Sequence, residues 1–319
     1  MTRLVRVELL RLRLRRAVLL LLVLAVVIPA VIFAARVWDT RTVDDADVLA
    51  DNYYAVDDCL QHPRRYGLER DAPDLQVVCE EMVVRDYSLR QPLSLASERG
   101  GSGLGVVAVL VAILFLLGTT FVGHDWNSGS MSNQLLFEPR RGRIWAAKAT
   151  AVGLVSFVVA AVVSLAYWLG LYAVMGLRDL AVADGALLDS LAYGVRGAAF
   201  ATAAALGGLA LTMLFRSTVA TIGVLFVVSV AGGLFIGVLG VGERWQPPKN
   251  VSAIVKNGTE YWVTVPQSCY QRRQPQPVEE GSSCDDTRDL TLLQGSLYYG
   301  LPLLGAGAAS VLSFRRRDV

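Results

Sequence analysis

Long apolar runs alternate with polar segments along the whole chain. A helix needs about 20 mostly apolar residues to cross a lipid bilayer. Runs of this length, with few charged residues inside them, occur at 17–37, 103–123, 149–174, 191–215, 219–241 and 292–313. The pattern predicts an all-α polytopic membrane protein with six transmembrane helices.

The polar segments between these runs differ in length and predict separate parts. The first long segment (38–102) is large enough for a small extramembrane domain, and the second long segment (242–291) for a structured loop. A central polar segment (124–148) joins the second and third runs. Because the chain crosses an even number of times, its N-terminal segment (1–16) and its tail (314–319) are expected on the same side as the central segment.

Helical spacing of apolar residues among arginines marks the N-terminal segment. Leu4, Val7, Leu10 and Leu14 recur every three or four residues, and six arginines surround them. This pattern is typical of a basic amphipathic helix on a membrane surface. The alternatives are a positive flank with no special role, and a cleaved signal peptide. The first run is longer than the roughly 7–15 apolar residues of a usual signal peptide.

Basic residues set the orientation of the predicted helices. Lys and Arg concentrate in the short cytoplasmic segments of membrane proteins. The N-terminal segment holds six arginines and one acidic residue, and the tail contains Arg315, Arg316 and Arg317. The central segment is also basic near its end. We therefore expect both termini and the central segment in the cytoplasm, and both long segments outside it.

Composition narrows the compartment and the partners. Of 30 basic residues, only Lys148, Lys249 and Lys256 are lysines. Such a bias is typical of GC-rich coding, so we expect a multi-pass protein of the cytoplasmic (inner) membrane of a high-GC bacterium, such as an actinobacterium. The net charge is +2, and the charges follow topology without forming a patch. The lipid bilayer is thus an expected partner, and nucleic acid is not.

Four cysteines fall in two pairs, one pair in each long segment. Two cysteines per exported segment favour disulfides in an oxidising space. We predict the bonds Cys59–Cys79 and Cys269–Cys284, each stabilising its loop by about 3 kcal/mol. Pairing across the two segments is an alternative, since four cysteines allow three connectivities. Zinc binding, with His62 as a further ligand, is another.

The predicted spans carry few groups that do chemistry. Arg196 is the only charged residue expected within a span, either on a transport pathway or reaching to the interface. Among the known motifs, the sequence lacks the phosphate-binding loop of ATPases, Gly-x-Ser-x-Gly and His-Glu-x-x-His. The chain is therefore not expected to be an enzyme, and energy for transport would come from another subunit.

The central segment has the signals of a short helix. Gly129 permits a turn, the serines beside it are candidate caps, and Pro139 ends the helix. Met131, Leu135 and Leu136 form an apolar patch of helical spacing, and an apolar stripe fits contact with a partner groove. Contact with lipid headgroups is the alternative.

Position by position, the central segment follows one pattern. It reads acidic–x–x–x–Gly–Ser/Thr–x–x–x–x–Leu–Leu–x–x–Pro–x–x–Arg, followed by Lys. The places are filled by Asp125, Gly129, Ser130, Leu135, Leu136, Pro139, Arg143 and Lys148.

With this pattern and six predicted spans, the chain resembles the membrane subunits of type-2 ATP-binding-cassette exporters, the ABC-2 permease family. Asp125 stands where Glu is commoner in that family. The turn Arg216–Val219 and the ending Phe314–Val319 also resemble the family's. The long cysteine-bearing segments depart from its minimal pattern and leave the substrate open.

The resemblance implies a permease that couples ATP hydrolysis on a separate subunit to export of a hydrophobic or amphipathic substrate. A coupling helix in the central segment would dock on a cytoplasmic ATPase homodimer, which binds ATP and Mg²⁺, while this chain binds no cofactor or metal. A second permease chain, identical or different, would complete the unit. The implied docking residues are Asp125, Gly129, Ser130, Met131, Leu135, Leu136, Phe137, Pro139, Arg140, Arg141 and Arg143.

Two other functions remain open. In the first, the ATPase drives the chain, but the chain moves no solute. It transmits a conformational change to an envelope partner through the two outer segments. In the second, the chain is a lone sensor or scaffold.

Overall fold

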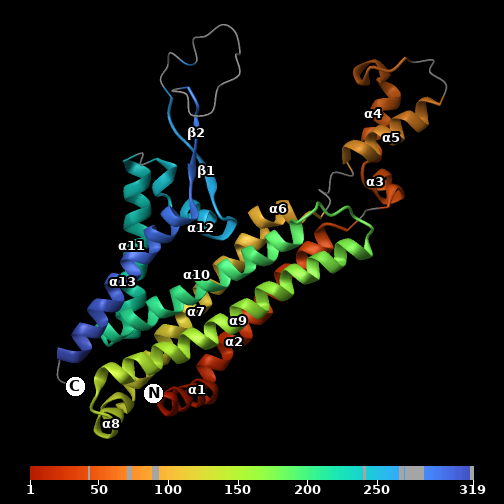
Figure 1. Cartoon of the computed structure of the whole chain (residues 1–319). Coiled ribbons are helices and arrows are strands. Elements are labelled where there is room, and N and C mark those ends of the chain that lie inside the picture. The colour runs from red at the N-terminus through yellow and green to blue at the C-terminus, as the bar shows by residue number, and fades with distance from the viewer. Residues whose placement is uncertain are drawn as a thin grey trace.

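Long helices form an elongated bundle with polar extensions at both ends (Figure 1). The computed structural model describes residues 1–41, 44–69, 74–87, 93–239, 242–265, 269 and 284–316. We call the end that carries both chain termini the basic end, and the opposite end, which carries the cysteines, the disulfide end.

The described residues include six helices long and apolar enough to cross a membrane. Their bounds are α2 (Arg16–Asp39), α7 (Ser102–Asn127), α9 (Arg141–Leu177), α10 (Ala186–Phe215), α11 (Thr218–Val238) and α13 (Leu292–Arg316). The short helix α6 (Leu95–Gly100) leads into α7. Each predicted span overlaps one of these helices, which indicates a multi-pass membrane protein. Helix α9 begins well before residue 149, where the apolar run starts, so Lys148 lies within it.

Helices α7, α9 and α10 pack together at the centre, and α2 lies along α7 and α9. The crossing of α7 and α10 is close because both helices present glycine there. A Cβ atom at Gly118 would overlap the carbonyl oxygen of Ala205, and one at Gly208 would lie 2.5 Å from that of Phe115. Small residues permit such approach between helices in lipid. Gly208 thus serves packing within one chain.

Helices α11 and α13 lie at the side of this centre and bury little of their surface. Gly232, Gly233 and Gly237 of α11 have no neighbouring atom near the position of a Cβ. The outward surface of α11 consists mainly of Val, Leu and Phe, as suits a helix in contact with lipid or with another apolar helix.

At the basic end, two short helices cross the ends of the long ones. Helix α1 (Thr2–Leu14) confirms helical structure in the N-terminal segment, and α8 (Ser130–Phe137) lies between α7 and α9. The last residues of the tail, 317–319, lie outside the described range.

At the disulfide end, the first long segment folds into α3 (Asp45–Asp51), α4 (Tyr53–Gln61), the 3₁₀ helix η1 (Pro63–Tyr66) and α5 (Leu75–Tyr87). The second contains η2 (Glu243–Trp245), α12 (Pro247–Lys256), β1 (Thr259–Trp262) and β2 (Thr287–Leu290). The strands pair antiparallel, with Thr259 opposite Leu290, and make this small ribbon the exception to an all-α fold.

Both disulfides join the cysteines that the sequence pairs. Cys59 in α4 is bonded to Cys79 in α5, and Cys269 to Cys284. The first bond is buried between its helices, since Cys59 is 1 % exposed. Because both sulfurs of each pair are in a disulfide, they are not available as zinc ligands.

Candidate functional site

Helix α8 begins after Gly129 and ends before Pro139, as the sequence predicts, but no serine side chain caps its start. Gly129 precedes it with φ of 67°, a left-handed conformation that glycine adopts without strain. The helix ends at Phe137, two residues before Pro139. Its apolar residues point in two directions. Met131 is fully buried, whereas Leu136 is 81 % exposed and Phe137 92 % exposed.

The structure divides the implied docking residues into an interior and a surface set. Asp125 and Met131 are both 0 % exposed, so neither reaches a partner on this surface. Leu135 is half-buried against the core, and the remainder of the set lies at the surface or partly so. The surface that α8 offers is therefore its C-terminal end, with Leu136 and Phe137 at its tip.

Asp125 belongs to a buried network of charges at the basic end. Lys148 of α9 is 0 % exposed and donates to the carboxylates of both Asp125 and Glu8, the latter at 2.9 Å. Arg15, between α1 and α2, donates to the other oxygen of Asp125 and to the carbonyl oxygen of Phe121. We refer to Glu8, Arg15, Asp125 and Lys148 as the inner network.

Charge balance explains how four ionised groups are held in the interior. Two carboxylates face one ammonium and one guanidinium, so the inner network is neutral as a whole. Removing a charge from water costs several kcal/mol unless close partners compensate it. The ring of Phe121 adds to this, because Lys148 Nζ lies 5.1 Å and Arg15 Cζ 4.7 Å from its centroid.

The inner network connects the N-terminal segment to two helices, α7 and α9, that are more than 100 residues away in the sequence. Glu8 comes from α1, Arg15 from the junction of α1 and α2, Asp125 from α7 and Lys148 from α9. Gln134 brings in α8, because its amide donates to Glu8 at 3.2 Å. Helix α8 is thus tied to the membrane helices by a buried methionine and by a hydrogen bond to this network.

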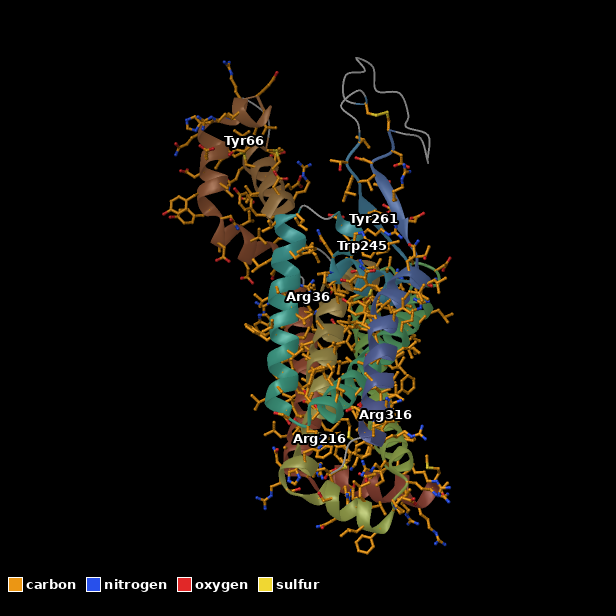
Figure 2. All side chains as sticks on the ribbon, turned by 90° about the vertical axis from the view of Figure 1, so that its left-hand side faces the viewer. Arg36, Tyr66, Arg216, Trp245, Tyr261 and Arg316 are labelled. Atoms are coloured by element: carbon orange, nitrogen blue, oxygen red, sulfur yellow. A yellow bond between two sulfur atoms is a disulfide. The ribbon has the colours of Figure 1, made fainter. Side chains whose placement is uncertain are left out.

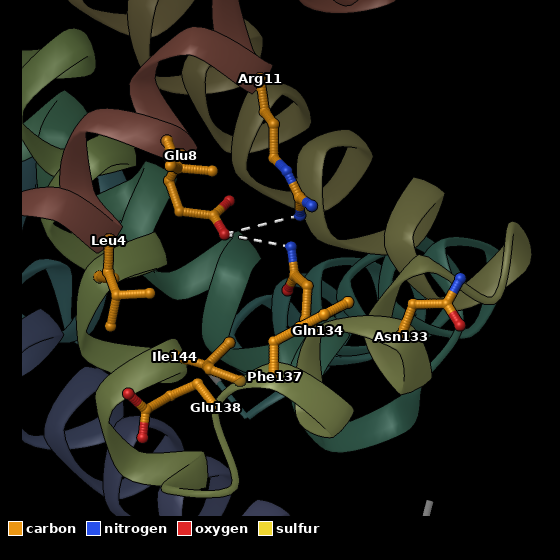
Figure 3. Close-up of a pocket in the computed structure, with 10 residues that line it drawn as sticks. Leu4, Glu8, Arg11, Asn133, Gln134, Phe137, Glu138 and Ile144 are labelled. Carbon is orange, nitrogen blue, oxygen red and sulfur yellow. Dashed lines mark hydrogen bonds and ion pairs between the residues drawn. The ribbon is translucent and has the colours of Figure 1, made fainter.

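A groove between α1 and α8 opens beside Glu8 (Figure 3). Its volume is about 210 Å³, and its walls are mainly apolar. Arg11 lies 3.7 Å from the Glu8 carboxylate. The side-chain oxygen of Gln134 is buried there without a hydrogen-bond partner among the described residues. The lining residues are Leu4, Val7, Glu8, Arg11, Asn133, Gln134, Phe137, Glu138, Ile144 and Ala147.

Sequence reasoning missed most of the inner network. Glu8 reads as a lone acid in a basic segment, and Lys148 as a basic residue at the edge of a span. Asp125 and Lys148 lie just outside the predicted apolar runs, yet the structure buries both within the long helices α7 and α9. The available signal was that Glu8 and Asp125 are acidic residues in the two most basic segments.

Arg196 lies near the disulfide end of α10 and contacts α12. Its guanidinium donates to the carbonyl oxygen of Val255 at 3.2 Å. This contact links α12 to α10. A role of Arg196 on a transport pathway stays a prediction.

At the disulfide end, a second ion pair joins α2 to the α6–α7 segment. Arg36 donates to both oxygens of Glu98, at 2.6 and 3.1 Å, and Glu98 is 2 % exposed. Ser102 also donates to Glu98, and Tyr167 of α9 donates to Ser102 at 2.6 Å. Residues 36 and 98 lie near the two points where the first long segment (38–102) meets the long helices.

Arg178, just after α9, holds the same junction. It donates to the carbonyl oxygen of Val37 at 2.6 Å and to that of Thr40 at 2.9 Å. These carbonyl groups lie at the C-terminal end of α2, where carbonyl oxygens have no N–H partner within the helix. The exit of the chain from α2 into the first long segment is thus fixed to both the α6–α7 segment and the end of α9.

The described residues contain no group of three or more His, Cys, Asp or Glu side chains arranged to hold a metal ion. No protein-family model matches the chain, and neither a curated protein nor a solved structure matches it. Function is therefore argued from the sequence motif and from the geometry described above.

Proposed function

We propose that this chain is the permease subunit of an ATP-binding-cassette exporter, and that α8 is the helix on which a separate ATPase subunit docks. The motif of the central segment is the sequence argument. The observation that carries the proposal is the form of α8, which is held from inside by Met131 and Gln134 and exposes Leu136 and Phe137 outward.

Two large apolar side chains at the tip of a helix, each more than four-fifths exposed, fit insertion into a partner's groove. The apolar groove between α1 and α8 begins beside Phe137, so a partner at this tip also meets α1. In this proposal the basic end faces the cytoplasm, as its arginines favour. ATP and Mg²⁺ bind to the partner.

The anchoring of α8 makes it suited to transmit movement. A force on Leu136 and Phe137 acts on a helix that contacts Glu8, and through the inner network on α1, α7 and α9. A flexible loop would absorb the same force. The substrate in this proposal is hydrophobic or amphipathic and is not otherwise identified.

Substitution of the exposed tip tests the docking. Leu136→Asp and Phe137→Asp in the full-length protein are expected to reduce ATPase co-purification from native membranes at least about tenfold, since a buried charge without a partner costs several kcal/mol. The ATPase is identified by mass spectrometry of the captured proteins. Because both side chains are exposed, size-exclusion profiles of the variants should match the original protein.

Leu177→Asp is the matched control. Leu177 is 85 % exposed at the other end of α9, so the same change there should leave ATPase capture intact. If the original protein captures no such ATPase, or if the α8 variants capture it equally well, the proposal fails.

The second candidate function, force transmission to an envelope partner, is favoured by the junction at the disulfide end. Arg36, Glu98 and Arg178 fix both connections of the first outer domain to membrane helices that reach the inner network. A domain that transmits no force would need no such attachment to the membrane helices. Stimulation of ATPase activity by small hydrophobic compounds favours export, and its absence favours force transmission.

A second permease chain remains part of the proposal. Helix α11 exposes apolar side chains along most of its length, including Phe226, Leu234 and Phe235. This surface suits a second permease helix as well as lipid.

A further inference from the structure

A pocket lined by arginines lies at the basic end, just after α8, and Pro139, Arg140, Arg141 and Arg143 of its lining also belong to the implied docking residues. Its volume is about 620 Å³, and it lies between the start of α9 and the end of α13. The lining residues are Pro139, Arg140, Arg141, Gly142, Arg143 and Arg315. Among the described residues no acidic side chain lines it, so it concentrates positive charge from two helices.

We propose that this arginine pocket binds the phosphate group of an anionic phospholipid in the adjacent membrane leaflet. Arginine side chains match phosphate oxygens in charge and geometry. Basic pockets between membrane helices on the cytoplasmic side are suited to anionic headgroups. The inference goes beyond the proposed function, since it holds whether or not an ATPase docks on α8.

Position favours a lipid over a protein ligand. Both helices that form the pocket are candidate membrane spans, and the pocket lies where α9 begins and α13 ends. These ends are joined, because Trp145 donates to Ser310 at 3.1 Å and Arg141 donates to the carbonyl oxygen of Phe314 at 3.3 Å. These contacts hold the pocket at the shared end of two candidate membrane spans, and a helix that crosses a bilayer meets the headgroup region at its ends. Figure 2 shows the neighbouring Arg316 at the end of α13, on the same end of the molecule as Arg216.

The backbone adds to the attraction of the arginines. Helix α9 has 37 residues, and its N-terminal end carries partial positive charge. Gly142, in the first turn, has no atom near the position of a Cβ, so the space beside its backbone is open. A phosphate group can approach the helix there without steric conflict.

Charge pairing leaves the pocket positive. Arg143 lies 3.9 Å from Glu138. Arg140 and Arg315 are exposed, so three arginines of the pocket stand against that one carboxylate. Arg141 has a structural role toward α13, so the test below leaves it in place.

The test measures phospholipid bound to the purified full-length protein by native mass spectrometry. Vesicles of phosphatidylglycerol and of phosphatidylcholine are the two lipid probes. The original protein is expected to retain phosphatidylglycerol in preference. The triple variant Arg140→Gln, Arg143→Gln, Arg315→Gln should weaken that binding on the order of 100-fold, because each basic residue contributes roughly a factor of five near a membrane surface.

Two control sets keep the result interpretable. The variant Arg64→Gln, Arg65→Gln, Arg85→Gln removes the same charge from the disulfide end and should retain the lipid. Gly142→Asp places a carboxylate in the open space without removing any arginine, and this variant should lose the lipid. Gly142→Ser adds an uncharged side chain at the same place and should retain the lipid. Loss in Gly142→Asp supports the site even if the triple variant fails to fold.

Three outcomes would overturn the assignment. Equal retention of both lipids would show that the arginines do not select phosphate-bearing anionic headgroups. Displacement of the lipid by inorganic phosphate at equal concentration would identify a soluble phosphate as the ligand. A triple variant that keeps the lipid and loses the ATPase would assign the arginines to a protein partner.

Discussion

The two ends of α2 are both tied to the α6–α7 segment by an ion pair, yet the pairs differ in their access to water. At the basic end, Arg15 binds Asp125, whose side chain is 0 % exposed and also binds Lys148. At the disulfide end, Arg36 binds Glu98, which is also buried, but the Arg36 side chain is 35 % exposed, compared with 15 % for Arg15.

This difference teaches which end is able to rearrange. A fully buried charge that loses its partner has no water to replace it, so the inner network holds one geometry or breaks at large cost. A half-exposed arginine exchanges its partner for water at smaller cost. We infer that the basic end moves as a unit, and that adjustment takes place at the disulfide end.

Removal of Lys148 is expected to have the largest effect. Lys148→Met keeps the length of the side chain but leaves Glu8 and Asp125 without their shared cation, and should lower the free energy of unfolding by about 3–5 kcal/mol. Thermal unfolding of the detergent-purified protein measures this. Lys249→Met is the control, since the ammonium of Lys249 is partly exposed and pairs with Glu243. Equal melting temperatures for both variants would remove the contrast between the ends.

Removal of Arg36 is expected to have an intermediate effect. Arg36→Met leaves Glu98 buried with Ser102 as its remaining donor, and an unsatisfied buried group costs about 1–3 kcal/mol. The same unfolding measurement applies, with the exposed Arg41→Met as control. If Arg36→Met lowered the free energy of unfolding as much as Lys148→Met, water would not compensate Glu98 for the loss of its partner.

The smallest effect is expected in the first outer domain, where water surrounds the charges. The Tyr66 hydroxyl donates to Asp58 at 2.8 Å and, with His62 and Arg65 nearby, holds the pKa of that carboxyl below its usual value. A lowered folded pKa stabilises the domain above the unfolded pKa, and this contribution is lost as the pH falls through the folded pKa.

Tyr66→Phe should therefore raise the pKa of Asp58 toward its usual value. Carbon NMR of labelled aspartate carboxyls in the full-length protein follows the titration, and Tyr87→Phe is the control. The stability difference between Tyr66→Phe and the original protein should shrink as the pH falls below the folded pKa. An unchanged Asp58 titration would contradict the assigned cause.

How far the sequence predicts this molecule depends on the range of each interaction. The spans, α8 and the two disulfides follow from local patterns, because apolar runs, Gly129, Pro139 and the cysteine spacing act within their own segments. The inner network does not follow, because Glu8 and Lys148 are 140 residues apart and meet only after the helices pack.

The candidate docking surface was also only partly predictable from the sequence. Spacing placed Met131 and Leu136 on one apolar patch, but the structure buries the first and exposes the second. A patch of three residues on a helix of eight is too short to reveal which side faces the core. The side of α8 that faces the core depends on contacts with other helices, such as the hydrogen bond from Gln134 to Glu8 of α1.

The order of the inner network along the chain has a consequence for its synthesis. Glu8, Arg15 and Asp125 leave the ribosome before Lys148, since proteins are made from the N-terminus. Until α9 enters the membrane, the nascent chain therefore contains both carboxylates of the inner network, Glu8 and Asp125, but only one of its two cations, Arg15. Entry of α9 supplies Lys148, so we expect the earlier segments to reach their final positions only at the third crossing.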